Sequence, residues 1–226
     1  TTAISTLSLH DALPIYGFHD AANSVGTVVA TRALPAKWAP AFSAFFNFLA
    51  LFVVGTAVAS TVGKTVKAEF ASEAVIFAGL FAAIAWNYIT WYIGMPSSSS
   101  HAIIGGLVGA GLAAGGLGAI SWSSVQKAAI GIIASPLVAF TIAFVLMYIV
   151  FLVQKIFKLH DDHPSFKGLQ LVSAAALSFG HGANDAQKTM GVIGALLLGA
   201  GYTTMDEAGK NIILPMWVEI AAYSAI

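Results

Sequence analysis

Residues 181–191, HGANDAQKTMG, place an amide, a carboxylate and an ammonium within five positions of an otherwise apolar segment. These groups belong to Asn184, Asp185 and Lys188. An ionisable side chain in mid-membrane costs about 3 kcal/mol or more, so it is by default a candidate for binding an anion or carrying a cation. The simpler alternative is a structural ion pair between Asp185 and Lys188, one helical turn apart.

A second stretch near the start of the chain has the same frame. GFHDAANSVG, residues 17–26, aligns without gaps on residues 182–191, and the shared frame is G-x-x-D-A-x-x-[S/T]-x-G. This stretch contributes His19, Asp20 and Asn23. Corresponding polar interruptions in two halves of a chain are typical of transporters built from repeats, with the binding site near the midplane between them. We therefore expect both segments to be broken helices that face a substrate cavity rather than lipid.

A third stretch, PSSSSH, opens a segment of small residues. Ser98, Ser99 and Ser100 at the start of an apolar helix offer hydroxyls together with free backbone N–H groups. The glycines that follow are better explained by close helix packing; they are Gly105, Gly109, Gly111 and Gly115. We interpret residues 93–121 as a re-entrant hairpin or a broken helix.

The elements that must position these groups are membrane helices. The chain of 226 residues is 58% hydrophobic and 9% charged, whereas a soluble domain is roughly one quarter charged. A bilayer requires about 20 apolar residues per helix, so the sequence predicts an integral membrane protein. The predicted spans are residues 40–61, 74–93 and 128–153, with interrupted segments at 15–34 and 169–201 and the start of another helix at 212–226.

The predicted fold class is an all-α polytopic transmembrane helical bundle with inverted-topology repeats, broken helices and a re-entrant Ser-rich hairpin. Residues 1–15 form a leader that resembles a translated sequencing-adapter scar. Residues 16–153 form the first repeat, 154–168 a polar loop, and 169–226 the start of a truncated second repeat. Because no counterpart of PSSSSH follows the second motif, we expect that the chain as given does not transport.

Several function classes are disfavoured by the composition. Ten basic and ten acidic residues cancel, which gives no electrostatic case for nucleic acid. The absence of cysteine excludes thiolate metal sites, and the histidines lack carboxylate partners at ligand spacing, so no metal, cofactor or catalytic site is expected. A channel remains as an alternative, although it predicts a continuous polar stripe. An intramembrane enzyme would need a nucleophile and a base, which only His101 beside the serines offers.

The three stretches together, read as GFHDAANS, PSSSSHAIIGGLVGAG and FGHGANDAQKTMG, resemble the inorganic phosphate transporter family over residues 16–226. The resemblance implies symport of inorganic phosphate, alone or as a metal–phosphate complex, with a proton or a sodium ion by alternating access. It also implies a lipid-embedded protein of a prokaryotic inner membrane, with a homodimer as one arrangement. Sulfate and other tetrahedral oxyanions remain alternative substrates.

The resemblance also assigns residues, and two of them depart from the family signature. His19 and Lys188 each stand where the signature has Asn, which weakens the case for sodium ligands there. The fixed ammonium of Lys188 supplies positive charge that sodium would otherwise bring, so we expect proton coupling. The implied substrate-binding residues are Asp20, Asn23, Ser98, Ser99, Ser100, Asn184, Asp185 and Lys188, and the implied coupling residues are Asp20, Asp185 and His19.

Overall fold

The computed structural model describes residues 24–95, 97–160, 163–209 and 211–225. The described part is built of helices and connecting turns with two isolated β-bridges, and the predicted all-α class is confirmed. Residues 24–30 are helical and lead into the first labelled element. His19, Asp20 and Asn23 lie outside the described residues.

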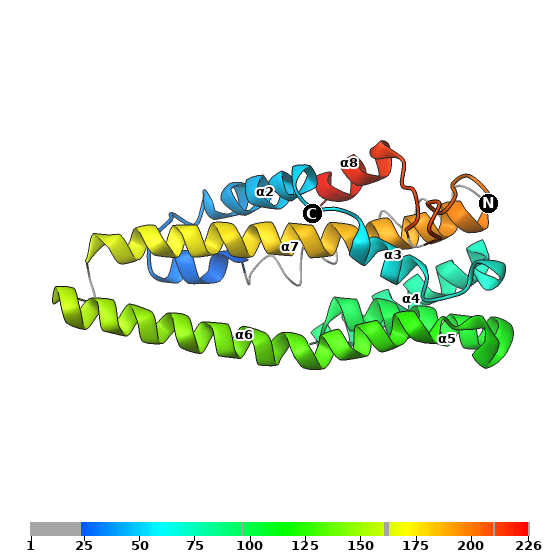
Figure 1. Cartoon of the computed structure of the whole chain (residues 1–226), viewed down its shortest axis with the longest axis horizontal. Helices are drawn as coiled ribbons and strands as arrows, with labels where there is room; N and C mark the ends of the chain where they lie inside the picture. The colour runs from blue at the N-terminus through cyan, green and yellow to red at the C-terminus, as the bar shows by residue number, and fades with distance from the viewer. Residues whose placement is uncertain (1–23, 96, 161–162, 210, 226) are drawn as a thin grey trace.

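Two long helices run the length of the molecule, α6 (Trp122–Phe157) and α7 (Pro164–Gly199) (Figure 1). Each has 36 residues, which corresponds to about 54 Å at the rise of an α-helix. The predicted span at 128–153 is therefore extended at both ends. Pro136 lies inside α6 without ending it.

The expected break in the segment 169–201 is wrong, because α7 is continuous through the polar motif. The polar side chains are accommodated without interrupting the backbone ladder. The Asn184 side chain donates to the carbonyl of Gly180 at 2.8 Å, and the Thr189 hydroxyl donates to the carbonyl of Asp185 at 3.4 Å. A helix can thus carry these groups on one face when that face borders a cavity.

The interruption lies instead in the predicted span 40–61. This segment forms α2 (Ala39–Leu49), a 3₁₀ turn η1 (Ala50–Phe52) and, after residues 53–56, α3 (Ala57–Gly63). Both helices pack on α7. A Cβ atom at Gly182 would lie 2.5 Å from the backbone of Asn47, so only glycine allows α2 to approach α7 this closely. We call residues 39–63 the interrupted span.

A helical hairpin is formed by α4 (Glu73–Tyr92) and α5 (Ser99–Gly115). A Cβ at Gly106 would lie 2.2 Å from the carbonyl oxygen of Gly79, so the two arms are in close backbone contact. Of the glycines expected to pack closely, Gly111 and Gly115 do, whereas the expectation is wrong for Gly105 and Gly109, where an added Cβ would meet nothing within 4 Å. The predicted span 74–93 is thus the first arm of the hairpin, and the expected hairpin at 93–121 supplies only its turn and second arm. The arms pack through a core shared with α3 and α7, which contains Ile76, Leu80, Ile103, Leu107, Val62 and Val192.

Shorter elements complete the structure. The 3₁₀ turns η2 (Ala68–Phe70) and η3 (Gly116–Ala119) flank the hairpin. The last helix, α8 (Met216–Ser224), begins four residues later than expected because an isolated bridge between Met205 and Ile212 precedes it. A second core, made largely of alanines, joins α8 to α7 and η1.

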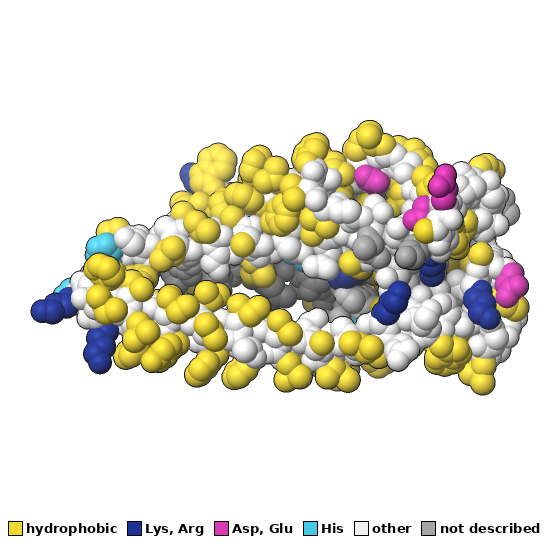
Figure 2. All heavy atoms as spheres, in the orientation of Figure 1, with side chains coloured by type: hydrophobic (Ala, Val, Ile, Leu, Met, Phe, Trp, Pro, Cys, Tyr) yellow, Lys and Arg dark blue, Asp and Glu magenta, His cyan; other side chains and the backbone are white. Residues whose placement is uncertain are grey.

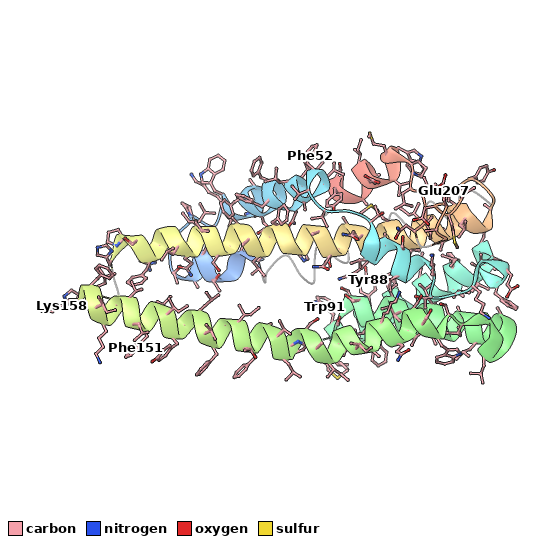
Figure 3. The ribbon with its side chains drawn as sticks, viewed as in Figure 1. Phe52, Tyr88, Trp91, Phe151, Lys158 and Glu207 are labelled. Carbon is pink, nitrogen blue, oxygen red and sulfur yellow. The ribbon has the colours of Figure 1, made fainter. Side chains whose placement is uncertain are left out.

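Within the described residues, three helices are long and apolar enough to cross a membrane: Glu73–Tyr92, Ser99–Ala119 and Trp122–Phe157. None of the most apolar stretch of α6 is buried among the described residues. Figure 2 shows hydrophobic side chains along the outer side of this helix, interspersed with other atoms, and basic side chains towards the ends of the molecule. Figure 3 shows Phe151 of α6 pointing away from α7. These features are those of a lipid-facing helix, and the chain is an integral membrane protein.

Candidate functional site

A cavity of about 560 Å³ borders the middle of α7, and we call it the polar cavity. The residues that line it come from α7, from the first turn of α5 and from the helical residues 24–30. Ligand pockets in proteins have volumes of roughly 300–1,000 Å³, so this cavity can hold a small ion with its water. The lining residues are Ser24, Ser100, Ala176, Leu177, Gly180, His181, Asn184, Asp185 and Lys188.

The geometry of an α-helix explains how α7 gathers its polar groups on the cavity. His181, Asn184, Asp185 and Lys188 are spaced i, i+3, i+4 and i+7, and residues at this spacing share one helix face. The motif therefore requires no break in the helix to present an imidazole, an amide, a carboxylate and an ammonium together.

Asp185 is the most buried charged group at the cavity, with 3% of its side chain exposed. Its Oδ1 accepts a short hydrogen bond from the Lys188 ammonium, so the ion pair considered from the sequence does form, and both partners line the cavity. His181 Nδ1 lies 3.3 Å from Asp185 Oδ2 without the geometry of a hydrogen bond. Among the described residues, Oδ2 has no hydrogen-bond partner. This carboxylate oxygen is therefore buried next to the imidazole of His181.

The serine cluster divides between structural and cavity positions. Ser98 is the N-cap of α5, and its hydroxyl accepts from the backbone N–H of His101 at 3.5 Å. Ser99 is buried, whereas Ser100 lines the cavity. Because Ser100 lies in the first turn of α5, the positive end of that helix also faces the cavity region. Helix N-termini with hydroxyls bind anions such as phosphate.

The structure thus brings together four of the predicted site residues. Ser100, Asn184, Asp185 and Lys188 line the polar cavity. Ser98 and Ser99 are not among its lining residues, and the predicted site residues of the first motif lie outside the described part of the chain.

Two further polar lining residues, Ser24 and His181, were not among the predicted site residues, although the sequence carries a signal for each. Ser24 occupies the Ser/Thr position of the shared frame, and its hydroxyl lies 3.0 Å from that of Ser43 on α2. His181 precedes Asp185 by one helical turn, and its Nδ1 lies 3.3 Å from Oδ2 of that carboxylate. The expectation that no histidine has a carboxylate at helical spacing is therefore wrong for this pair.

This arrangement can bind an anion and a cation at one place. The ammonium of Lys188, the hydroxyl of Ser100 and the N-terminus of α5 favour an anion, whereas the buried Asp185 favours a cation or a proton. Such a combination suits a site that takes up both ions together.

The chain is similar to several proteins named as phosphate transporters. The chain is 46% identical over 214 residues to a Rhizobium meliloti protein named "Probable low-affinity inorganic phosphate transporter", covering 93% of this chain and 62% of that protein. A Bacillus subtilis protein of the same name is 42% identical over 94% of this chain and 63% of its own length. The chain therefore spans about three fifths of the length of these two relatives.

The fold also has a match among solved structures. A structure described as "The sodium-dependent phosphate transporter" superposes with a TM-score of 0.75 at 21% identity, covering 98% of this chain and 72% of the other. The chain is thus related to transporters rather than to enzymes. Residues 16–226 match the sequence model of the Phosphate transporter family, and the chain belongs to this family.

Proposed function

We propose that the protein is a secondary active transporter that symports inorganic phosphate with a cation by alternating access. The observation that carries the proposal is that Lys188, Asp185 and Ser100 line one cavity beside the N-terminus of α5. Phosphate binding in the middle of long membrane helices is the geometry that alternating access requires. The names of the relatives supply the substrate class.

In this proposal, phosphate is bound between α5 and α7. The ammonium of Lys188, the amide of Asn184 and the hydroxyl of Ser100 donate to its oxygens, with Ser98 and Ser99 shaping the first turn of α5. Asp20 and Asn23 of the first motif complete the site from the opposite half, as the shared frame suggests. Asp185 and Asp20, with His19 as hydrogen-bond partner, carry the coupled cation.

The coupled cation is a proton in our proposal. Lys188 already provides a tethered positive charge to Oδ1 of Asp185, where a sodium ion would otherwise sit. Oδ2, which has no hydrogen-bond partner in the described part of the chain, can bind a proton, because a proton needs no coordination sphere of several oxygens. The carrier resides in the inner membrane of a prokaryote, and the homodimer is its proposed assembly.

Because we expect the chain as given not to transport, the test uses a protein of the full length of the relatives in lipid vesicles. Uptake of labelled phosphate is measured with sodium and pH gradients imposed separately. We expect uptake that follows the pH gradient and ignores the sodium gradient. Uptake driven by sodium alone would contradict proton coupling, and preferential uptake of labelled sulfate would identify a carrier for another tetrahedral oxyanion.

The variant Lys188→Gln removes the ammonium and leaves Asp185 without its ion-pair partner. We expect phosphate affinity to fall by about tenfold or more, since a hydrogen bond to a charged group contributes about 1.5–3 kcal/mol. The matched control is Lys167→Gln, because Lys167 is an exposed lysine of the same helix outside the cavity. Equal affinities of the two variants would exclude Lys188 from the anion site.

A further inference from the structure

Gln187 belongs to the polar motif of α7 but does not line the polar cavity. Its side chain is buried, with 2% exposed. Its Oε1 accepts from the backbone N–H of Val58 at 2.8 Å and from that of Ala59 at 3.4 Å. Both N–H groups belong to the first turn of α3, the helix that follows the break in the interrupted span.

The break creates a need for such an acceptor. A helix that starts anew leaves the N–H groups of its first turn without partners in the helix. Thr56, the N-cap of α3, makes no capping hydrogen bond with its side chain. An unpaired backbone group away from water costs several kcal/mol in hydrocarbon, so a neighbouring acceptor is required. Gln187 supplies from α7 the oxygen that an N-cap side chain usually provides.

One turn further along α7, its backbone is in close contact with the backbone of α3. A Cβ at Gly191 would lie 2.4 Å from the carbonyl oxygen of Ala59, and a Cβ at Gly63 would lie 2.6 Å from that of Gly191. The hydrogen bonds of Gln187 therefore belong to a contact in which α3 can neither slide nor rotate without a clash.

We propose that Gln187 is a positioning residue that caps α3 from the neighbouring helix and holds the interrupted span in register with the turn of α7 that carries Asp185 and Lys188. The motif then has two roles on different faces of one helix. His181, Asn184, Asp185 and Lys188 face the cavity, while Gln187 and Gly191 hold the interrupted span.

Amide hydrogen exchange at Val58 and Ala59, measured on the whole chain in lipid nanodiscs, tests the cap directly. We expect both amides to be protected in the wild type. The variant Gln187→Met keeps the side-chain volume but removes the acceptor, and exchange at these amides should accelerate about tenfold or more. The variant Gln187→Glu keeps an acceptor oxygen, and protection should return.

The two variants separate capping from packing. If the side chain at position 187 only filled space, the amides of Val58 and Ala59 would stay protected in Gln187→Met. They would lose protection in Gln187→Glu, because the buried charge would disrupt the packing. The matched control is Gln170→Met, because Gln170 lies on α7 and accepts from the hydroxyl of Thr31 at 2.7 Å. This control should leave exchange at Val58 and Ala59 unchanged. If Gln187→Met does not fold, the exchange rates of the wild type test the cap. Amides of Val58 and Ala59 that exchange as fast as the amide of Gly55 would overturn it.

The positioning role rests on the proposed function and has its own readout. Phosphate affinity should weaken in Gln187→Met and recover in Gln187→Glu, although neither change touches the cavity. Accelerated exchange with unchanged phosphate affinity would overturn the positioning role. Absence of phosphate binding in the wild type would refute the proposed function but would not affect the capping role of Gln187. Unchanged amide exchange in Gln187→Met, with normal phosphate binding, would refute the capping role but not the proposed function.

Discussion

At the scale of single residues, the polar groups of α7 lie on two faces of the helix, one toward the polar cavity and one toward the interrupted span. Asp185 and Lys188 were predicted as an anion and cation site or a structural ion pair, and the structure shows that the pair forms on the wall of a cavity. The spacing of these residues made their shared face predictable. The role of Gln187 was not predictable, because its partners lie about 130 residues away on a helix whose start is created by tertiary structure.

Ser100 provides the first residue-scale prediction. Replacement by Ala removes one hydroxyl donor from the cavity while keeping the helix, since Ala is a better helix former than Ser. Phosphate affinity should fall about tenfold, the effect of losing a hydrogen bond to a charged group. Equilibrium dialysis with labelled phosphate measures this.

The control for that measurement is Ser165→Ala, an exposed serine in the first turn of α7. It should leave phosphate affinity unchanged. If Ser100→Ala binds phosphate as tightly as Ser165→Ala does, the first turn of α5 has no part in the site.

At the scale of elements, the sequence predicted helix existence well and helix continuity poorly. Hydropathy located α4 and α6 because long apolar runs have few other solutions in a bilayer. The polar motif was read as a break in α7, but side-chain hydrogen bonds to the preceding turn leave that helix intact. The real interruption, at residues 53–56, lies in an apolar stretch where Gly55 and Thr56 are the only local signals. Its position depends on α7, which caps the second piece.

Gly191 offers a test of how the interrupted span packs. The variant Gly191→Ala places a methyl group 2.4 Å from the carbonyl oxygen of Ala59, so α3 must move away from α7. We expect a loss of about 1–3 kcal/mol in the free energy of unfolding, the usual cost of overpacking. Denaturation in mixed micelles followed by circular dichroism measures it.

The matched control lies on the same helix. At Gly168 nothing would meet an added Cβ within 4 Å, so Gly168→Ala should stabilise the protein by about 0.5–1 kcal/mol through helix propensity. If the two variants change stability equally, the close contact between α3 and α7 does not exist in the membrane.

At the scale of the whole molecule, composition already indicated an integral membrane protein. Because the apolar side chains of α6 are exposed among the described residues, we expect this helix to carry a lipid-facing surface. The sequence could not foresee that α6 packs so little against its neighbours, because a run of apolar residues reads alike whether it meets lipid or protein. The inverted arrangement of the two repeats stays a prediction, drawn from the frame shared by residues 17–26 and 182–191.

The absence of cysteine makes the lipid-facing surface directly testable. A spin label on Phe140→Cys, an exposed position of α6, should be accessible to oxygen dissolved in the bilayer and protected from a water-soluble relaxing agent. A label on Val192→Cys, in the core between α7 and its neighbours, should be protected from both. High water accessibility at Phe140→Cys would show that α6 borders an aqueous space.

The central claim is that phosphate binds in the polar cavity against Lys188. Solid-state NMR of the protein in lipid, with lysine side chains labelled by nitrogen-15, measures the dipolar coupling between bound phosphate and an ammonium nitrogen. The account predicts a coupling that corresponds to an ion pair, with a separation of about 4 Å or less, and its complete loss in Lys188→Gln. Bound phosphate with no such coupling, or a coupling that survives in Lys188→Gln, would contradict it.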